Sequence, residues 1–334
     1  MDGSDMIDVK KILAKYSEEL NGPMDAFLPP EKPDNLMAAT VQYPRAGGKR
    51  MRPAMVLAAA GAVNGDKKKA MPLAVAIEYI HNFTLIHDDY MDGDEKRRGM
   101  DTIHMKYGGP TAILAGDALF AKAFEVIAHL DVPDNVMREV LKVVTRAVWD
   151  LARGQQMDVN NENGEEVTMD EYIETIRLKT SVLFAAGAAG GALVGGASKD
   201  TVNAVHEYAM LLGVAFQMFD DVLGLVGDPV KLGKSVGNDI RKGKSTVMVT
   251  HALKNINDPE IMKEFRSILG KSGASEDDIG KVRKIMEDTG SIEFAISMAE
   301  GYTKRAIEKL SCLGPGEDKD FMIALAEYAM KRDV

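Results

Sequence analysis

The chain has 334 residues, of which 46% are apolar and 28% charged, a composition typical of a folded globular protein. Asp and Glu number 51 against 41 Lys and Arg, and the net charge of −10 argues against nonspecific nucleic-acid binding, which depends on neutralising phosphates. A single cysteine, Cys312, excludes an intramolecular disulfide framework and a cysteine-based metal cluster, and we expect a cytoplasmic protein.

Apolar residues recur at three- and four-residue steps along most of the chain, which predicts an all-α fold with no sustained strand. The predicted helices are 7–20, 73–91, 113–130, 136–159, 202–225, 261–269, 279–286 and 292–310. Segment 227–245 is rich in Gly and Lys and is predicted to be a long loop. No linker of domain-boundary length divides the chain. We therefore expect one helical domain over residues 1–334, although length alone favours about two domains.

The uncharged stretch over residues 181–198 is a candidate for a membrane helix. It holds Gly187, Gly191 and Gly195 at four-residue spacing, a pattern found where membrane helices pack together. Most of its other residues are Ala and Gly, which gain little from contact with lipid. We expect no membrane span and interpret the stretch as a helix packed very closely against its neighbours.

The most informative segment begins at His81 and reads HNFTLIHDDYMDGDEKRRG. Asp88 and Asp92 are four residues apart, so on a helix their carboxylates lie one turn apart on one face, where like charges repel. The apolar residues before them indicate the end of a buried helix, and carboxylates gathered there need a cation. Oxygen-only ligands favour Mg²⁺, which takes one or two carboxylates and completes its shell with water and phosphate. Arg97 and Arg98 follow, and arginine suits phosphate binding.

A second acidic pair, Asp220-Asp221, ends another apolar helix far downstream. Taken alone, either acidic segment is also explained as a charged helix end. Two such ends in one chain suggest that they face each other across a cavity. Basic residues lie between and around them: GGKRMRP at 47–53, Lys179, Lys234 and Lys244. Carboxylates, cations and the absence of a cysteine cluster together describe a site that holds a magnesium diphosphate.

The order of these motifs resembles that of the trans-isoprenyl diphosphate synthases, the farnesyl/geranylgeranyl diphosphate synthase family. The resemblance extends over residues 40–250 and rests on motifs whose specificity lies in their common order. They are GGKRMRP at 47–53, DDYMD at 88–92, Arg97-Arg98, GQQMD at 154–158, Lys179-Thr180, FQMFDD at 216–221 and Lys234.

The resemblance implies a helical bundle of the isoprenoid synthase type with a central apolar cavity. It also implies several Mg²⁺ ions that bind together with diphosphate, held by Asp88, Asp92 and Asp220; with Lys179, these are the implied catalytic residues. Isopentenyl diphosphate and allylic diphosphates are the implied substrates. The implied substrate-binding residues are Lys49, Arg52, His81, Arg97, Arg98, Lys179, Thr180, Gln217 and Lys234. Among them Arg97 is matched to the allylic diphosphate and the group Lys49, Arg52, His81 and Arg98 to isopentenyl diphosphate.

The implied reaction is ionisation of the allylic substrate, attack by the double bond of isopentenyl diphosphate and loss of a proton. Two alternatives remain open. A non-catalytic subunit of a heteromeric synthase is disfavoured because the aspartate motifs are intact, and a terpene cyclase because the isopentenyl residues are present. One departure is Gly224, which stands where the second motif usually closes with an aspartate. The resemblance assigns the direct metal contact to Asp220.

Product length is predicted from Phe83, which lies about 7.5 Å along a helix from Asp88 at 1.5 Å per residue. An aromatic residue there, together with the short DDYMD motif, resembles the archaeal geranylgeranyl type, so a C20 product is expected with farnesyl diphosphate (C15) as the alternative. Phe83 is also explained as an ordinary core residue; if it is the tunnel floor, Ile80 and Ile77 lie below it. The family resemblance further implies a homodimer. We also expect segment 227–245 to close over the diphosphates, with a mobile surface loop as the alternative.

Overall fold

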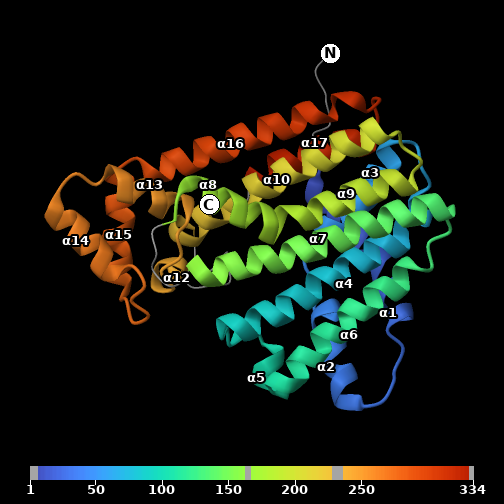
Figure 1. Cartoon of the computed structure of the whole chain (residues 1–334), viewed down its shortest axis with the longest axis horizontal. Coiled ribbons are helices and arrows are strands. Elements are labelled where there is room, and N and C mark those ends of the chain that lie inside the picture. Colours follow the sequence, from blue (N-terminus) through green and yellow to red (C-terminus); the bar gives the residue numbers. More distant parts are fainter. Residues whose placement is uncertain (1–6, 162–166, 228–235, 331–334) are drawn as a thin grey trace. The chain divides into compact units, whose positions relative to one another are not determined.

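The computed structural model describes residues 7–161, 167–227 and 236–330. These residues are mostly helical, which confirms the predicted fold class (Figure 1). The helices are α1 (Val9–Phe27), α2 (Asp34–Arg45), α3 (Met51–Ala62), α4 (Lys67–Asp92), α5 (Ile103–Tyr107), α6 (Gly109–Ile127), α7 (Asp134–Asn161), α8 (Met169–Ile176), the π-helix η1 (Arg177–Ser181), α9 (Val182–Val194), α10 (Lys199–Val226), α12 (Asn238–Arg241), α13 (Val247–Asn255), α14 (Pro259–Ile268), α15 (Glu276–Asp288), α16 (Ser291–Lys309), the 3₁₀-helix η2 (Leu310–Cys312) and α17 (Glu317–Met330).

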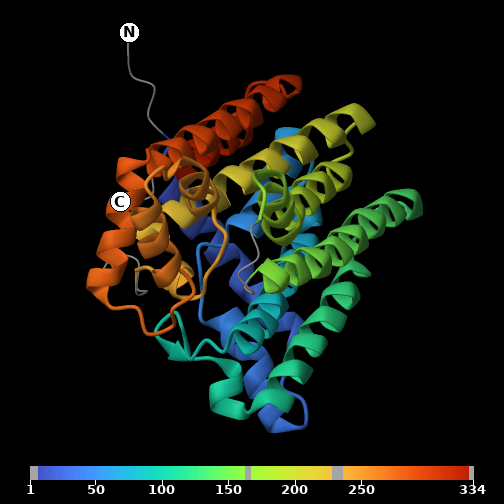
Figure 2. The same ribbon diagram turned by 60° about the vertical axis from the view of Figure 1, so that its left-hand side comes forward.

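One short strand pair breaks the helical pattern. β1 (Lys96–Arg97) pairs with β2 (Met100–Asp101) in antiparallel register directly after α4, and Figure 2 shows them as arrows. They are the only strands in the described parts of the chain. Two residues per strand are too few to leave a period-two signal, so the sequence did not predict this hairpin. It matters because it carries Arg97.

Every predicted helix falls within or overlaps an observed one, but several observed helices were not predicted. Helix α3 shows why, because its residues from Pro53 to Ala60 are all buried and no polar face marks a helical period. The predicted loop over 227–245 is wrong in part, since Asn238–Arg241 form α12. Residues 228–235 of that segment lie outside the described residues.

The chain divides into two compact units. The first comprises Met1–Val148, Leu183–His206 and Leu310–Ala324, and the second Trp149–Val182, Glu207–Lys309 and Leu325–Val334. The chain passes from one to the other inside helices α7, α10 and α17, at the start of α9 and between α16 and η2, so no loop linker marks these boundaries. A single domain over residues 1–334 stays a prediction, as does the central apolar cavity.

In the first unit the closely packed stretch is α9. A Cβ atom added at Gly191 would overlap the carbonyl oxygen of Val56 in α3, and one at Gly187 would lie 3.2 Å from Cγ2 of the same valine. The glycines therefore let two helix backbones approach, which is the interpretation that the sequence favoured. With 13 residues, α9 is shorter than the roughly 20 that a membrane span needs.

By length and composition, α10 is apolar enough to cross a membrane, the one such helix among the described residues. More than half of its most apolar window is buried inside the structure. Core helices of folded proteins pass the same test, and α10 also carries Gln217 and the pair Asp220-Asp221. We therefore interpret α10 as a core helix.

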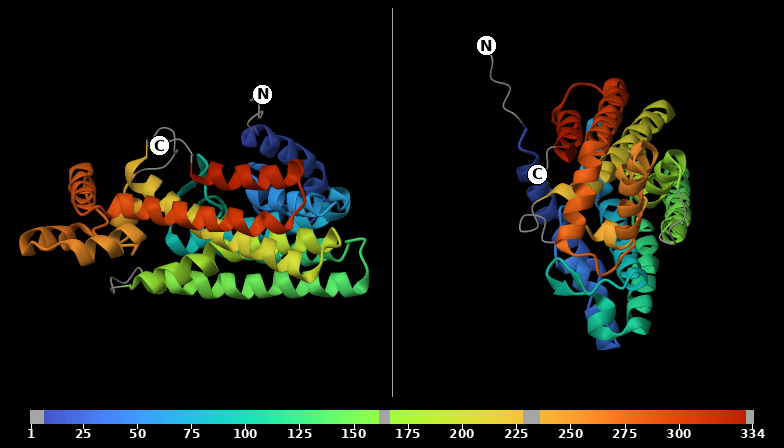
Figure 3. Two further views of the ribbon diagram at one scale, coloured as in Figure 1. Left: turned by 90° about the horizontal axis from the view of Figure 1, so that it is seen from above. Right: turned by 90° about the vertical axis from the view of Figure 1, so that its left-hand side faces the viewer.

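The second unit is built on helices α13 to α16, which pack against one another (Figure 3). Phe265 of α14, Val282 of α15 and Ala295 of α16 lie in one buried apolar cluster. Met218 and Val222 of α10 belong to the same cluster. Because these two residues flank the acidic pair in sequence, the packing fixes the turn of α10 on which Asp220 and Asp221 stand.

Candidate active site

The first acidic motif occupies the last turn of α4, which ends at Gly93 in the left-handed conformation. That turn contains no basic residue, and the carbonyl end of a helix carries a partial negative charge. Asp88 and Asp92 are both half-buried there. Two carboxylates added to a negative helix end are unfavourable without a nearby cation, so the position is suited to one.

Asp89, between them, has a different role. It is 1% exposed, and its carboxylate accepts hydrogen bonds from Nε of Arg97 at 2.7 Å to each oxygen, while Nη2 lies 2.5 Å from Oδ1. The hydroxyl of Tyr43, at the end of α2, donates to Oδ2 of the same carboxylate. Burial lowers the pKa of Arg97, but hydrogen bonding to Asp89 and its charge outweigh this and raise it. The sequence did not reveal this group, because nothing in the pattern links residue 43 to residue 89.

The double glycine before α3 has a backbone conformation that favours glycine, and Arg98 lies against it. Gly47 and Gly48 have φ angles of 78° and 149°, and a Cβ atom at Gly48 would lie 2.9 Å from Nη2 of Arg98. The Arg98 guanidinium donates to the carbonyl oxygen of Gly47. The GGKRMRP loop and the hairpin therefore meet through this arginine.

Arg50 anchors the same loop and faces inward. Its φ of 48° is left-handed, and its guanidinium donates to the carboxylate of Glu78 in α4 and to the backbone carbonyl of Pro44. Asn82 donates a further hydrogen bond of 2.9 Å to Glu78. The side chains of Arg50 and Glu78 are 1% and 2% exposed. The flanking Lys49, in contrast, is exposed.

Arg52 and His81 lie side by side, with Nη1 of the arginine 3.4 Å from Nε2 of the histidine. The Arg52 guanidinium also stacks on the ring of Phe184, 4.3 Å from its centroid. Burial, followed by the positive charges of Arg52, Arg98, Arg97 and Arg50, holds the pKa of His81 well below its usual value. The same positive charges that lower this pKa would also attract an anion. The structure thus brings together Arg52, His81 and Arg98.

In the second unit the Lys179-Thr180 pair lies on the π-helix η1, a form that often marks functional sites. Gly154 makes room for it, since a Cβ atom there would overlap the backbone nitrogen of Lys179. The close approach places Asp158 of α7 with its Oδ2 2.5 Å from Nζ of Lys179 and 3.2 Å from Nζ of Lys244. Burial raises the pKa of Asp158, but the two lysines outweigh it and the pKa is lowered.

The second acidic motif is ordered by a chain of hydrogen bonds. Thr180 donates to Oε1 of Gln217 at 2.9 Å, and Nε2 of Gln217 donates to Oδ1 of Asp221 at 2.9 Å. The hydroxyl of Tyr172 donates to Oδ2 of Asp221 at 2.8 Å. Burial and the charge of Asp239 raise the pKa of Asp221 to about 8. Both carboxylate oxygens of Asp221 are thus hydrogen-bonded to other side chains of the protein. The half-buried Asp220 is better suited to bind a metal ion.

The donor set fits Mg²⁺ bound with a substrate. Across residues 7–161, 167–227 and 236–330, no three His, Cys, Asp or Glu side chains converge as a preformed metal cage. Asp88 and Asp92 of the first unit offer two oxygen ligands from one helix turn, and Asp220 is a separate predicted ligand in the second unit. Magnesium accepts one or two carboxylates when phosphate and water complete its shell.

Phe83, the residue predicted to set product length, lies among other aromatic rings. Phe83 is half-buried, and its ring makes edge-to-face contacts with Phe120 of α6 at 5.4 Å and with His87 at 5.8 Å. Phe120 in turn contacts Phe124 at 5.1 Å. The sequence missed these two rings, although their four-residue spacing on α6 was a signal. Lys234 lies outside the described residues, so closure of its segment stays a prediction.

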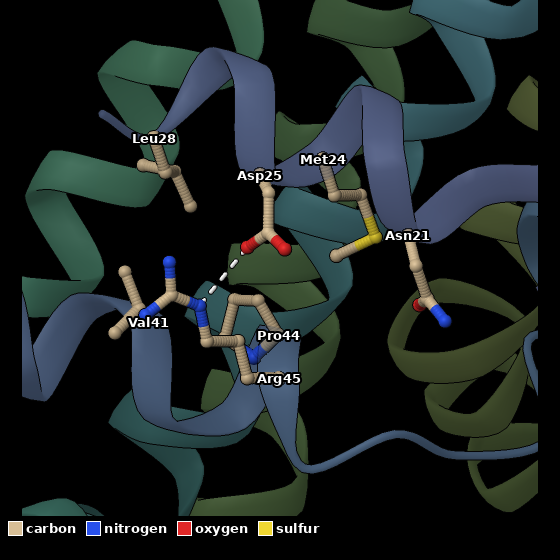
Figure 4. Close-up of a pocket in the computed structure, with 7 residues that line it drawn as sticks. All are labelled: Asn21, Met24, Asp25, Leu28, Val41, Pro44 and Arg45. Atoms are coloured by element: carbon tan, nitrogen blue, oxygen red, sulfur yellow. Dashed lines mark hydrogen bonds and ion pairs between the residues drawn. The ribbon is translucent and has the colours of Figure 1, made fainter. Parts of the chain in front are cut away.

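A cavity of about 220 Å³ lies between α1 and α2 of the first unit (Figure 4). It is lined by Asn21, Met24, Asp25, Leu28, Val41, Pro44 and Arg45. Its one arginine, Arg45, is paired with Asp25 at 2.9 Å, so the cavity lacks the net positive charge that a diphosphate requires. None of the predicted site residues lines it.

Comparisons with known proteins match this arrangement. The family described as polyprenyl synthetase matches residues 33–286. A geranylgeranyl diphosphate synthase of Methanosarcina mazei is 37% identical over 318 residues, 95% of this chain and 96% of that protein. A geranylfarnesyl diphosphate synthase of Aeropyrum pernix is 39% identical over 307 residues, 90% and 95% of the two chains. The crystal structure of a geranylgeranyl pyrophosphate synthetase from Pyrococcus horikoshii is similar with a TM-score of 0.92 and 39% identity, covering 97% of this chain and 99% of that one.

Proposed function

The chain belongs to the polyprenyl synthetase family and is a trans-prenyltransferase, and we propose that it condenses isopentenyl diphosphate with allylic diphosphates to give geranylgeranyl diphosphate. One observation carries the proposal: a carboxylate helix end in the first unit adjoins a group of Arg97, Arg98 and Arg52, with the neutral His81 beside Arg52. Prenyl transfer needs this combination, because two diphosphates must be bound and one must leave.

Each basic group has its own task in the reaction. Arg97, with one edge held by Asp89, binds the allylic diphosphate through its other edge. Lys49, Arg52, His81 and Arg98 bind the diphosphate of isopentenyl diphosphate. Separate sites are required because the double bond of one substrate must meet the ionised carbon of the other. Holding both substrates in place converts a bimolecular step into a unimolecular one.

Mg²⁺ held by Asp88, Asp92 and Asp220 would neutralise the negative charge that develops on the departing diphosphate. The residues of the second unit act on the opposite charge. The hydrogen bond from Thr180 fixes the amide of Gln217, and both oxygens can offset the positive charge of the allylic cation. Lys179, oriented by Asp158, adds a cation toward the released diphosphate. The released diphosphate accepts the proton that is lost, because no general base is evident.

A C20 product is supported by the aromatic contacts of Phe83. Phe83, Phe120 and Phe124 form a continuous row of rings across α4 and α6, two helices that pack against each other. Such a row is bulkier than Phe83 alone and blocks an elongating chain over a wider area. The related proteins bear the names of both C20 and C25 synthases, so their names do not decide the product length of this chain. The residues that close the end of the substrate tunnel must decide it.

We further propose a cytoplasmic homodimer. Ile113, Leu114 and Phe120 of α6 are 43%, 56% and 37% exposed, an unusual concentration of large apolar side chains on one helix. Ile113 and Phe120 are seven residues apart, so they share a face of α6. A second copy of the chain would cover them, since stable dimer interfaces are large and apolar.

The proposal is tested by incubating the protein with isopentenyl diphosphate, Mg²⁺ and dimethylallyl, geranyl or farnesyl diphosphate in turn. Product length is then determined by chromatography. Condensation ending at C20 with every primer is expected. Absence of any condensed product would refute the function and favour a non-catalytic subunit, whereas release of a hydrocarbon would indicate a cyclase. A product of C15 or C25 would retain the reaction and overturn the assigned length.

A further inference from the structure

Tyr43 and Pro44, consecutive residues in the last turn of α2, each hold one part of the basic group in the first unit. Tyr43 is 1% exposed and donates its hydroxyl proton to Asp89, which binds Arg97. The backbone carbonyl of Pro44 accepts a hydrogen bond from Arg50, the anchor of the GGKRMRP loop. Neither residue belongs to a motif that the sequence singled out.

The orientation of Arg97 depends on the carboxylate of Asp89. Nε and Nη2 of the arginine face that carboxylate, so the Nη1 edge is the one that a ligand meets. The terminal torsion of an aspartate is broad and twofold, so a single partner does not fix the plane of its carboxylate. Tyr43 supplies a second partner at Oδ2, and together the two bonds set the plane in which the Arg97 guanidinium lies.

We propose that Tyr43 is a positioning residue for the allylic diphosphate, which acts through Asp89 to aim the Nη1 edge of Arg97. The inference rests on the proposed function, because it takes Arg97 as the allylic subsite. It also assigns Asp89, the middle acid of DDYMD, to positioning rather than to metal binding.

A purely structural role for Tyr43 makes a different prediction. Loss of its hydroxyl would then lower stability without separating the two substrates. Tyr79 provides the matched control, because it is also fully buried in the first unit and donates a hydrogen bond of 2.5 Å, to the backbone carbonyl of Met24. Its partner is in α1, and within the described parts of the chain its hydroxyl is hydrogen-bonded neither to Asp89 nor to Arg50.

The test uses titration calorimetry on the full-length chain with saturating Mg²⁺ and two probes, isopentenyl diphosphate and the unreactive geranyl S-thiolodiphosphate. For Tyr43→Phe we expect the thiolodiphosphate to bind about 10-fold more weakly, the effect of losing one hydrogen bond in a charged group. Binding of isopentenyl diphosphate alone should change less than about twofold.

Tyr79→Phe should leave both affinities unchanged. Equal thiolodiphosphate affinity in Tyr43→Phe and the wild type would overturn the proposal, as would an equal weakening of both probes. If Tyr43→Phe does not fold, Asp89→Asn tests the same relay, since it keeps the shape and removes the charge that orients Arg97; it should show the same selective loss. A wild type that makes product while Tyr43→Phe binds the thiolodiphosphate equally tightly would refute the positioning role and leave the proposed function standing.

Discussion

Oδ2 of Asp239 lies 3.3 Å from the position that a Cβ atom would occupy at Gly224. Gly224 is the place where the second aspartate motif usually closes with a carboxylate. In this chain a carboxylate from α12 fills the same space, and Asp239 is the charge that most raises the pKa of Asp221 after burial itself. A carboxylate from a residue fifteen positions further along the chain therefore lies beside the position of the missing aspartate.

Gly224→Asp should therefore destabilise the folded protein rather than restore the usual motif to advantage. The new carboxylate would stand beside Asp239, and like charges in a partly buried setting repel. We expect a loss of about 1–3 kcal/mol in the free energy of unfolding without Mg²⁺, the usual range for an unfavourable partly buried substitution. Urea unfolding measures it. Gly224→Asn, of equal size and no charge, should lose less, and Gly224→Asp combined with Asp239→Asn should regain most of the loss. Unchanged stability in Gly224→Asp would contradict this account.

The sequence alone was sufficient for the helical fold and for the positions of the basic and acidic motifs, because both depend on local spacing. Asp88 and Asp92 share a face of α4 since four residues make one turn. The role of Asp89 was not predictable in the same way. It depends on Tyr43 from another helix and on Arg97 from a hairpin too short to leave a pattern, and contacts between distant segments are set by tertiary packing.

Asp88 and Asp89, neighbours in sequence, should respond to substitution in opposite ways. Asp88→Asn removes a proposed metal ligand from a half-buried position, so we expect turnover to fall about 100- to 1,000-fold, as when one group that stabilises transition-state charge is removed. Its free energy of unfolding should change by less than about 0.5 kcal/mol. Asp89→Ala leaves Arg97 buried without its carboxylate and should cost about 3–5 kcal/mol in stability.

Steady-state kinetics at saturating Mg²⁺ and urea unfolding of both variants provide the measurements. Near-normal turnover of Asp88→Asn would refute its metal role. A stable, folded Asp89→Ala would show that the buried pair with Arg97 contributes little.

His81 should make stability depend on pH. Its pKa is lowered in the folded state by burial and by the surrounding arginines, so below pH 6.5 the unfolded chain binds the proton and the folded chain does not. Stability therefore rises with pH through this window and falls as the pH drops below 6.5. At pH 5.5 the penalty amounts to about 1.4 kcal/mol for a histidine that stays neutral when folded.

His81→Asn should remove that penalty, so the variant should lose less stability than the wild type between pH 7.5 and 5.5 in urea unfolding. His129→Asn, at an exposed position of the first unit, should follow the wild type. Parallel curves for His81→Asn and the wild type would show that the folded protein protonates His81 without cost.

The proposed dimer depends on the exposed apolar face of α6. Leu114→Glu places a charge where a second copy would bury it, and we expect dimer dissociation to become about 100-fold easier, which corresponds to about 2.7 kcal/mol. Ile261→Glu is the control, because Ile261 is similarly exposed at 41% but lies on α14 of the second unit. Sedimentation velocity at micromolar protein measures both. A wild type that is monomeric and active would refute the dimer, and a dimer unaffected by Leu114→Glu would place its interface elsewhere.

Product length should respond to Phe83 and Phe120 together. Phe83→Ala opens space next to α4, but the ring of Phe120 packs against Phe83 at 5.4 Å and is held by Phe124, so the row of rings is only partly opened. We therefore expect Phe83→Ala to yield C25 beside C20, and Phe83→Ala with Phe120→Ala to yield longer chains, because Ile80 and Ile77 then form the next floor one and two turns further along α4. Phe294→Ala, at an aromatic position in the second unit, should leave product length unchanged. Chromatography of the products with a farnesyl diphosphate primer gives the result. If the double variant makes the same chain length as the wild type, the aromatic row is not the floor, and the assignment of a C20 product loses its physical basis.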